Sequence, residues 1–428
     1  MLETCKFILS LDIGGANTKT SFLCLDLSEY KSQSEPLNLD HYGNILNFSS
    51  SLFYSTQYFP FWERKRQDFM KVLKILQSNT EKKLLNHVSQ QYPSICSLKL
   101  VNTEKFYQRT NGIFRKTKKE LANAISVSYD IAVTITAELS DAFSTKQEGI
   151  KLICEQLQEV FNPNFIHVIN VNAEFISVKE ALEDYLSVSA SNWIAPSLVF
   201  GERERLGMLL DMGTTTTDII PIKDGKPVPI GKNDVDRMLN YELFYTGILR
   251  PPIASIVRHV PFRNSLCPIS FEEFAIMADV YTVLGMITER EYSCDTADGR
   301  GKSIEECFAR LARIICGDIN LIQQHEIEEM AQYIYTSQKE MVQEAIRRSI
   351  NHFIRRFLIP VSKIRFNVTG LGAKILLIPA LRELNIHENQ IFFKSLSEQE
   401  HVLSTAICLG IVFLKQIVQH ELLSDQVS

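Results

Sequence analysis

The sequence predicts an α/β protein built from two similar halves, with helical additions in the second half. The main observation is a repeat: the pattern LDIGGANTK, which begins at Leu11, returns as LDMGTTTTD at Leu210. Strand-like apolar runs also alternate with helical patterns along the chain. A length of 428 residues is enough for two hydrophobic cores.

Each copy of the repeat lies between two apolar runs, which predicts a strand, a tight turn and a second strand. Glycine lets backbone N–H groups approach an anion closely, and threonine hydroxyls add further donors. We therefore expect both turns to bind phosphate, although ordinary surface turns have a similar composition. Lys19 either neutralises phosphate charge or points outward as a hairpin lysine. The expected binding residues are Gly14, Gly15, Asn17, Thr18, Lys19, Gly213, Thr214, Thr215, Thr216 and Thr217.

An aspartate precedes each turn at the end of a predicted strand. A carboxylate would repel phosphate directly, so we expect Asp12 and Asp211 to hold a hydrated Mg²⁺ ion that bridges to phosphate oxygens. Two such turns facing one cleft would clamp a diphosphate or the tail of a nucleotide. These two aspartates are therefore the first candidates for metal-binding and catalytic residues.

Between the two hairpins, an apolar strand pattern at 131–135 is followed by two carboxylates and a helix over 145–161. Glu138 and Asp141 come after the strand end, where a carboxylate can accept a proton from a substrate. The alternative is that they cap the helix and compensate its dipole. A strand over 165–171 and a helix over 178–185 continue the α/β alternation.

The boundary between the halves predicts domains at 1–203 and 204–428, with a helical insertion at about 270–357. A polar turn inside the insertion contains Asp298 and Arg300. Arg300 would pair with a carboxylate or phosphate and Asp298 would hold an amine, unless the turn is merely solvated. A final strand over 364–368 leads into Gly370, Gly372 and a helix, a place suited to an anion or nucleotide or, alternatively, a plain tight turn.

Composition excludes some partners. A net charge of −5 gives no basic field for nucleic acid, and we expect the basic stretch 109–119 to be the solvated start of a helix. The apolar run 402–414 is too short to span a membrane and predicts a buried C-terminal helix. Nine cysteines without a metal-binding spacing predict reduced thiols in a cytoplasmic protein. We assign no role to residues 28–56 and 90–119.

Several segments identify a family resemblance. The runs DIGGANTK at Asp12, NWIAPSLVFGE at Asn192, ELFYTGILRPPI at Glu242 and DTADGRGKS at Asp295 resemble a hydantoinase/oxoprolinase-related family. Together with TAELSDAFSTKQEG at Thr136, they spread over most of the chain. That family is related to actin, sugar kinases and heat-shock chaperone ATPases. The resemblance implies two ribonuclease-H-like domains that face a central cleft.

The best-understood members of this family act in methanofuran biosynthesis. The resemblance implies a transferase that joins a furanylmethyl diphosphate to the phenol of γ-glutamyltyramine and releases diphosphate. It implies small-molecule substrates and Mg²⁺, with ATP not expected, and leaves the oligomeric state open. An ATP-dependent small-molecule kinase or oxoprolinase-like amidohydrolase is the alternative, which the turn at Gly370 and Gly372 favours. A third hypothesis is a chaperone-like ATPase switch, but we expect no separate peptide-binding domain that would support it.

Overall fold

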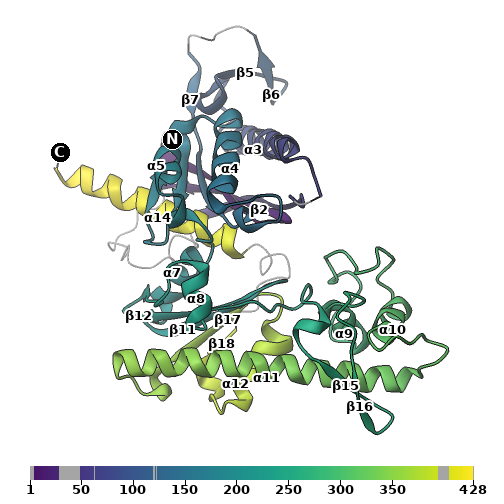
Figure 1. Cartoon of the computed structure of the whole chain (residues 1–428). Helices are drawn as coiled ribbons and strands as arrows, with labels where there is room; N and C mark the ends of the chain where they lie inside the picture. Colours follow the sequence, from purple (N-terminus) through teal and green to yellow (C-terminus); the bar gives the residue numbers. More distant parts are fainter. Residues whose placement is uncertain are drawn as a thin grey trace. The chain divides into compact units, whose positions relative to one another are not determined.

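The computed structural model describes residues 4–27, 49–61, 63–118, 121, 123–393 and 404–427. The chain forms two compact units (Figure 1). The first contains Met1–Arg203 and Glu398–Ser428, and the second contains Glu204–Ser397. The change of unit after Arg203 coincides with the boundary expected from the sequence.

The first unit is built on a six-stranded sheet of order β10-β9-β8-β1-β2-β3. β1 and β2 form an antiparallel hairpin that β3 extends, while β8 and β9 run parallel to β1 on its other side. The strands are β1 (Cys5–Ile13), β2 (Asn17–Asp26), β3 (Ser49–Tyr58), β8 (Asp130–Ile135), β9 (Ile166–Ile169) and β10 (Phe175–Ser177).

The sheet of the second unit repeats this arrangement in the order β13-β12-β11-β17-β18. A hairpin lies on one side of the central strand β11, and two parallel strands lie on the other. The strands are β11 (Leu206–Met212), β12 (Thr217–Lys223), β13 (Lys226–Pro227), β17 (Arg365–Thr369) and β18 (Ile391–Phe392), with β14 (Leu243–Phe244) paired to β12. The shared order and polarity are those of the expected ribonuclease-H-like fold.

Alternation along β1 separates the two faces of the first sheet. Phe7, Leu9 and Leu11 pack into a core with α3 (Phe69–Gln91) and α4 (Lys146–Val160). Ser10 points to the opposite face, which α14 (Ser404–Val427) covers. A Cβ atom on Gly410 would lie 2.5 Å from the Oγ of Ser10, so glycine allows this close approach.

The C-terminal helix corrects the expected domain bounds. Residues up to 428 were expected in the second domain, but α14 contacts β1, β2 and α7 (Ile194–Arg203) of the first unit. Phe413 of this helix lies against His167, with ring centroids 4.6 Å apart. The chain therefore returns to its first unit after completing the second, which no local pattern reveals.

A small sheet of order β6-β5-β4-β7 also belongs to the first unit. Its strands are β4 (Ser97–Leu100), β5 (Lys105–Thr110), β6 (Ile113–Thr117) and β7 (Ile125–Val127). The basic stretch that was expected to start a helix therefore forms a hairpin, and that prediction is wrong. Asn111 and Gly112 have φ values of 50° and 77°, as the tight turn of a β-hairpin requires.

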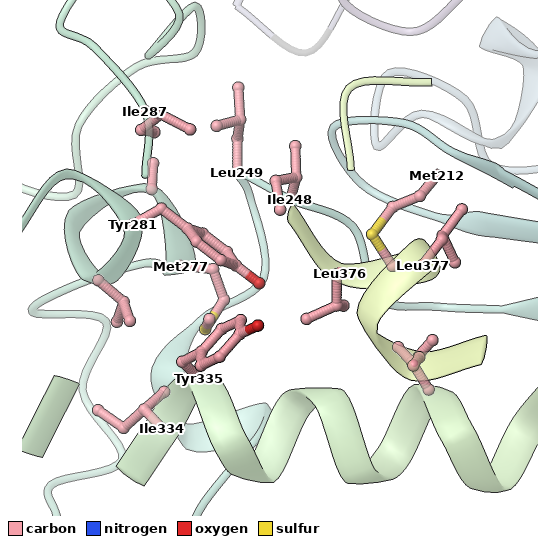
Figure 2. Packing of buried hydrophobic residues seen from close by; sticks show 14 of the residues in the cluster. Met212, Ile248, Leu249, Met277, Tyr281, Ile287, Ile334, Tyr335, Leu376 and Leu377 are labelled. Atoms are coloured by element: carbon pink, nitrogen blue, oxygen red, sulfur yellow. The ribbon is translucent and has the colours of Figure 1, made fainter. Parts of the chain in front are cut away.

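The expected helical insertion is present in the second unit. It contains α9 (Met277–Val283), α10 (Ile304–Arg313) and α11 (Gln324–Phe357), and a short hairpin of β15 (His259–Phe262) and β16 (Ser265–Pro268) precedes it. Figure 2 shows residues of α9 and α11, including Tyr281 and Tyr335, in one cluster with Met212 and Leu376. The remaining α-helices are α5 (Val178–Glu183), α6 (Tyr185–Val188), α8 (Asp234–Leu239) and α12 (Ile378–Glu383).

Two expectations concern the chain as a whole. All nine cysteines are free thiols. Among the described residues, no helix has the length and apolar character needed to cross a membrane.

A buried ion pair ties α9 to α10. The Nε of Arg310 donates to Asp279 Oδ1 at 2.8 Å, and both side chains are fully buried. The hydroxyl of Tyr292 and the N–H of Ile276 also donate to the Asp279 carboxylate. Burial raises the pKa of Asp279, whereas the Ile276 N–H and Arg310 favour its charged form.

Arg310→Met should lower the free energy of unfolding by roughly 3–5 kcal/mol, because it leaves the Asp279 carboxylate buried without its cation. Arg313→Met is the control, since Arg313 pairs with Asp298 but is partly exposed, and it should cost about 1 kcal/mol or less. Urea denaturation of both variants measures the difference. Equal losses would show that the buried pair has no special weight.

Candidate functional site

The two glycine turns have the same hydrogen bond at their base. The N–H of Gly14 donates to the carbonyl of Asn17, and the N–H of Gly213 donates to the carbonyl of Thr216, each at 2.9 Å. The turns thus connect β1 to β2 and β11 to β12 in the same way. The repeat seen in the sequence is therefore a repeat in structure.

Each turn is braced through its carbonyl oxygens by a segment of its own unit. In the first unit, Phe61 and Phe59 donate their N–H groups to the carbonyls of Gly15 and Ala16 at 3.0 and 2.8 Å. In the second unit, three N–H groups bond to the carbonyls of Gly213 and Thr214. Their donors are Ile248, Leu249 and Arg250, at 3.0, 3.1 and 3.0 Å.

This bracing orients the amides. In a trans peptide the carbonyl and the following N–H point in opposite directions. Because the carbonyls of Gly213 and Thr214 face the bracing segment, the N–H groups of Thr214 and Thr215 point away from it. In the first unit the carbonyls of Gly15 and Ala16 face their bracing segment, so the N–H groups of Ala16 and Asn17 point away from it. Each turn therefore presents adjacent donors, the arrangement that binds oxyanions.

The bracing segments are themselves anchored in the cores. The Phe59 and Phe61 rings lie 5.1 Å apart, and Phe61 lies 4.8 Å from Phe69 of α3. Ile248 and Leu249 are each 1 % exposed, and Figure 2 shows them in the cluster that contains Met212. Neither segment was expected to support a turn, because the contacts that define both segments are non-local.

Asp12 lies at the end of β1 and is almost completely buried. Burial raises its pKa, and Lys19 opposes that shift from 3.5 Å away. Lys19 is the residue directly opposite on β2, so the hairpin itself sets this pair. Lys19 therefore faces Asp12 in this structure rather than projecting freely into solvent.

Asp211 occupies the equivalent position at the end of β11 and is half-buried. Gly370 lies against it: a Cβ on Gly370 would be 2.4 Å from Asp211 Oδ1, and its φ of +86° also requires glycine. Asp218 is opposite on β12 but forms a buried ion pair with Arg237. The charge of Asp218 is thus compensated within the unit.

Some donors expected to bind phosphate are already engaged or buried. The hydroxyl of Thr217 donates to the carbonyl of Thr246 at 2.7 Å, and the Thr18 side chain is fully buried. The N–H of Gly372 donates to the carbonyl of Met212 at 3.1 Å. These groups build the site and do not present donors to a ligand. By contrast, Thr214, Thr215 and Thr216 are half-buried.

The two carboxylates after β8 differ in exposure. The Thr136 N–H donates to the carbonyl of Ile13 at 2.8 Å, so the end of β8 lies beside the first turn. Glu138 has no exposed side-chain surface and lies 3.9 Å from the Nζ of Lys146, whereas Asp141 is exposed. Glu138 is thus shielded from solvent, whereas Asp141 is accessible to it.

Asp298 and Arg300 lie between α9 and α10. Arg310 and Arg313 donate to Asp298 at 3.1 and 2.9 Å, and Asp298 accepts the N–H of Arg300 at 3.2 Å. The pKa of Asp298 is lowered by the Arg300 N–H and the two arginines, against an opposing effect of burial. The carboxylate that was expected to hold a substrate amine thus pairs with two arginines of the protein. The Arg300 side chain is mostly exposed.

Solved structures with a similar fold align with almost the whole chain. A nucleotide-free acetone carboxylase matches with a TM-score of 0.47 and 10% identity over 95% of this chain and 70% of its own. The activator of 2-hydroxyisocaproyl-CoA dehydratase from Clostridium difficile, with bound ADPNP, matches with a TM-score of 0.37 and 10% identity over 97% of both chains.

Two curated relatives are much closer in sequence. The chain is 39% identical over 277 residues to the (4-{4-[2-(gamma-L-glutamylamino)ethyl]phenoxymethyl}furan-2-yl)methanamine synthase of Methanocaldococcus jannaschii, covering 63% of this chain and 80% of that protein. It is 36% identical over 169 residues to the synthase of the same name from Methanococcus vannielii, covering 40% and 72%.

The family model described as Hydantoinase/oxoprolinase matches residues 130–400, a span that contains the second turn and the segment that braces it. With that match and two relatives of this identity, the chain belongs to the hydantoinase/oxoprolinase family.

Proposed function

We propose that the chain is a transferase that forms an aryl ether between a furanylmethyl diphosphate and the phenol of γ-glutamyltyramine, with release of diphosphate, in methanofuran biosynthesis. The observation that carries this proposal is the 39% identity to a synthase whose name describes that ether, over 80% of the relative's length. The braced turns support it because each presents adjacent amide donors for phosphate oxygens.

The proposed reaction breaks the bond between the furanylmethyl carbon and the diphosphate oxygen. The phenol oxygen then bonds to that carbon, and its proton leaves to a base. Negative charge accumulates on the departing diphosphate, so donors fixed at that position lower the barrier most. We assign this role to the backbone amides of the two turns and the hydroxyls of Thr214, Thr215 and Thr216, with Lys19 as a nearby cation.

Mg²⁺ would add charge neutralisation on the leaving diphosphate. In the described part of the chain, no group of three or more His, Cys, Asp or Glu side chains is placed to hold a metal ion. Proteins often bind Mg²⁺ through one or two carboxylates, while substrate phosphates and water complete the shell. We assign Mg²⁺-binding roles to Asp12 and Asp211, each near the end of the central strand of its own unit.

The phenol proton requires an accessible acceptor. Of the two carboxylates after β8, we assign this role to Asp141, because it is exposed and Glu138 is buried beside Lys146. The ATP-dependent activity remains the alternative, and within the turn that favours it the N–H of Gly372 is engaged with Met212. We place the reaction in the cytoplasm, as expected for cofactor biosynthesis from small molecules.

The reaction can be tested directly. Purified protein incubated with Mg²⁺, the aminomethylfuranyl diphosphate and γ-glutamyltyramine should form the ether and one equivalent of diphosphate without ATP. Mass spectrometry follows both products. Product formation only in the presence of ATP, with ADP released, would overturn the transferase in favour of the ATP-dependent alternative.

Asp12→Asn and Asp211→Asn should each reduce turnover at least about 100-fold, the scale of losing a group that stabilises developing charge. Stability should behave differently for Asp12. Its folded-state pKa is raised by burial, so the ionised carboxylate costs stability above its ordinary pKa, and this cost disappears at lower pH. Asp12→Asn should therefore melt at or above the wild-type temperature at neutral pH, measured without Mg²⁺, with the difference shrinking as pH falls.

The control is Asp224→Asn, because Asp224 is an exposed aspartate of the second unit beyond the end of β12. It should retain wild-type turnover. If Asp12→Asn or Asp211→Asn remained fully active, that aspartate would have no metal-binding role.

A further inference from the structure

The long helix α11 carries an amide in the middle of its buried face. Gln338 is fully buried and lies between apolar residues such as Ile334 and Val342 on the same helix. Burying an amide without hydrogen-bond partners costs free energy, so the partners of Gln338 indicate its role. Both of its polar atoms are engaged with groups from other elements.

The nitrogen of Gln338 holds the segment that braces the second turn. Its Nε2 donates to the hydroxyl of Thr246 and to the carbonyl of Gly247, each at 2.8 Å. The backbone carbonyl of Thr246 in turn accepts a hydrogen bond from the hydroxyl of Thr217, the first residue of β12. The amide is therefore joined through Thr246 to the end of the phosphate turn.

Gly247 transmits this position to the turn itself. A Cβ on Gly247 would lie 2.5 Å from both Thr214 C and Thr215 N, so its backbone lies directly against the peptide that joins Thr214 to Thr215. The next three residues donate to the turn carbonyls, as described above. A displacement of Gly247 would therefore move the amides that we assign to diphosphate.

The orientation of the Gln338 side chain is fixed from its other side. The Tyr281 hydroxyl of α9 donates to Gln338 Oε1 at 2.5 Å. The Gly247 carbonyl can only accept, so the nitrogen must face it. A glutamate of the same shape could accept from Tyr281, but when ionised it would place a negative oxygen against that carbonyl.

We propose that Gln338 is a positioning residue through which the helical insertion sets the phosphate turn at Thr214 and Thr215. The inference rests on the proposed function, since it assumes that this turn binds diphosphate. The helical insertion would then have a role at the turn, although the two segments are far apart in the sequence. Tyr281 and Gln338 together connect α9 and α11 to one short segment, so both helices act on the turn at the same point.

The test is Gln338→Glu, studied between pH 6 and 8.5. Ionised, the substituted carboxyl cannot donate to Thr246 or Gly247, and kcat/KM should fall about 10- to 100-fold, as expected for the loss of these two buried hydrogen bonds. Burial raises the pKa of a carboxyl, so lowering the pH should protonate it and restore one donor. The ratio of variant to wild-type activity should therefore rise as pH falls.

Neighbouring titratable groups do not contribute to this pH dependence of the activity ratio. Burial raises the pKa of Tyr281 well above its ordinary value, and burial also raises that of Tyr335, its neighbour in the same cluster, so both stay neutral over the range. Gln332→Glu places the same substitution on an exposed position of the same helix and should match wild type at every pH. Thr246→Val, which removes one acceptor, should give a smaller loss without pH rescue, and it serves if Gln338→Glu does not fold.

Two further readouts separate positioning from general destabilisation. The KM for the furanylmethyl diphosphate should rise and kcat should fall, while the KM for γ-glutamyltyramine stays constant. Calorimetric titration with inorganic diphosphate and Mg²⁺ should show weaker binding by the variant at pH 8.5 that recovers at pH 6. A loss that is equal at all pH values, or unchanged diphosphate affinity, would overturn the inference.

The outcomes also distinguish this inference from the proposed function. If wild-type protein forms no ether, the proposed function fails, whereas the diphosphate titration still reports on the turn. If wild-type protein forms the ether and Gln338→Glu has wild-type kinetics at pH 8.5, only the role of Gln338 fails.

Discussion

The hydrogen bonds between each turn's carbonyls and a segment of its own unit are the constraint on which the proposed chemistry depends. A two-stranded hairpin alone is only marginally stable and would leave its turn free to change conformation. Here the carbonyls of Gly15 and Ala16, and those of Gly213 and Thr214, are held by N–H groups anchored in a hydrophobic core. Their amides are thereby fixed before any ligand arrives, which is what electrostatic preorganisation requires.

The two units use this plan with different surroundings. Asp12 faces Lys19 across its hairpin, so a cation is already present beside the first carboxylate. Across the second hairpin Asp211 faces another aspartate, Asp218, whose charge is compensated by Arg237. The first brace is aromatic, whereas the second relies on Ile248, Leu249 and the buried amide of Gln338. The two turns thus share their backbone hydrogen bond and differ in the segments that support them.

Sequence reasoning recovers what is local and repeated. The strands flanking Asp12 and Asp211, the strand before Thr136 and the parallel strand before Gly370 follow from apolar runs and turn residues. Exposure was harder to predict, because Thr217 and Thr18 resemble their half-buried neighbours in composition, yet one is bonded to Thr246 and both are buried. The basic stretch 109–119 was also expected to start a helix, although Asn111 and Gly112 form the turn of a β-hairpin.

Other features were hidden because they join distant segments. The bond between Gln338 and Gly247 links residues 91 positions apart, and α14 packs against β1 from the far end of the chain. Neither contact has a local signature. The carboxylate of Asp298 looked available for a substrate amine because its partners, Arg310 and Arg313, lie on the next helix.

Hydrogen–deuterium exchange of the turn amides tests the central claim most directly. Adding Mg²⁺ and diphosphate should slow exchange at Thr214 and Thr215, and at Ala16 and Asn17, by about tenfold or more, while the ladder amides of Ile219 and Ile220 stay unchanged. Unaltered exchange at both turns under saturating diphosphate would show that these amides do not bind the leaving group, and would contradict the account.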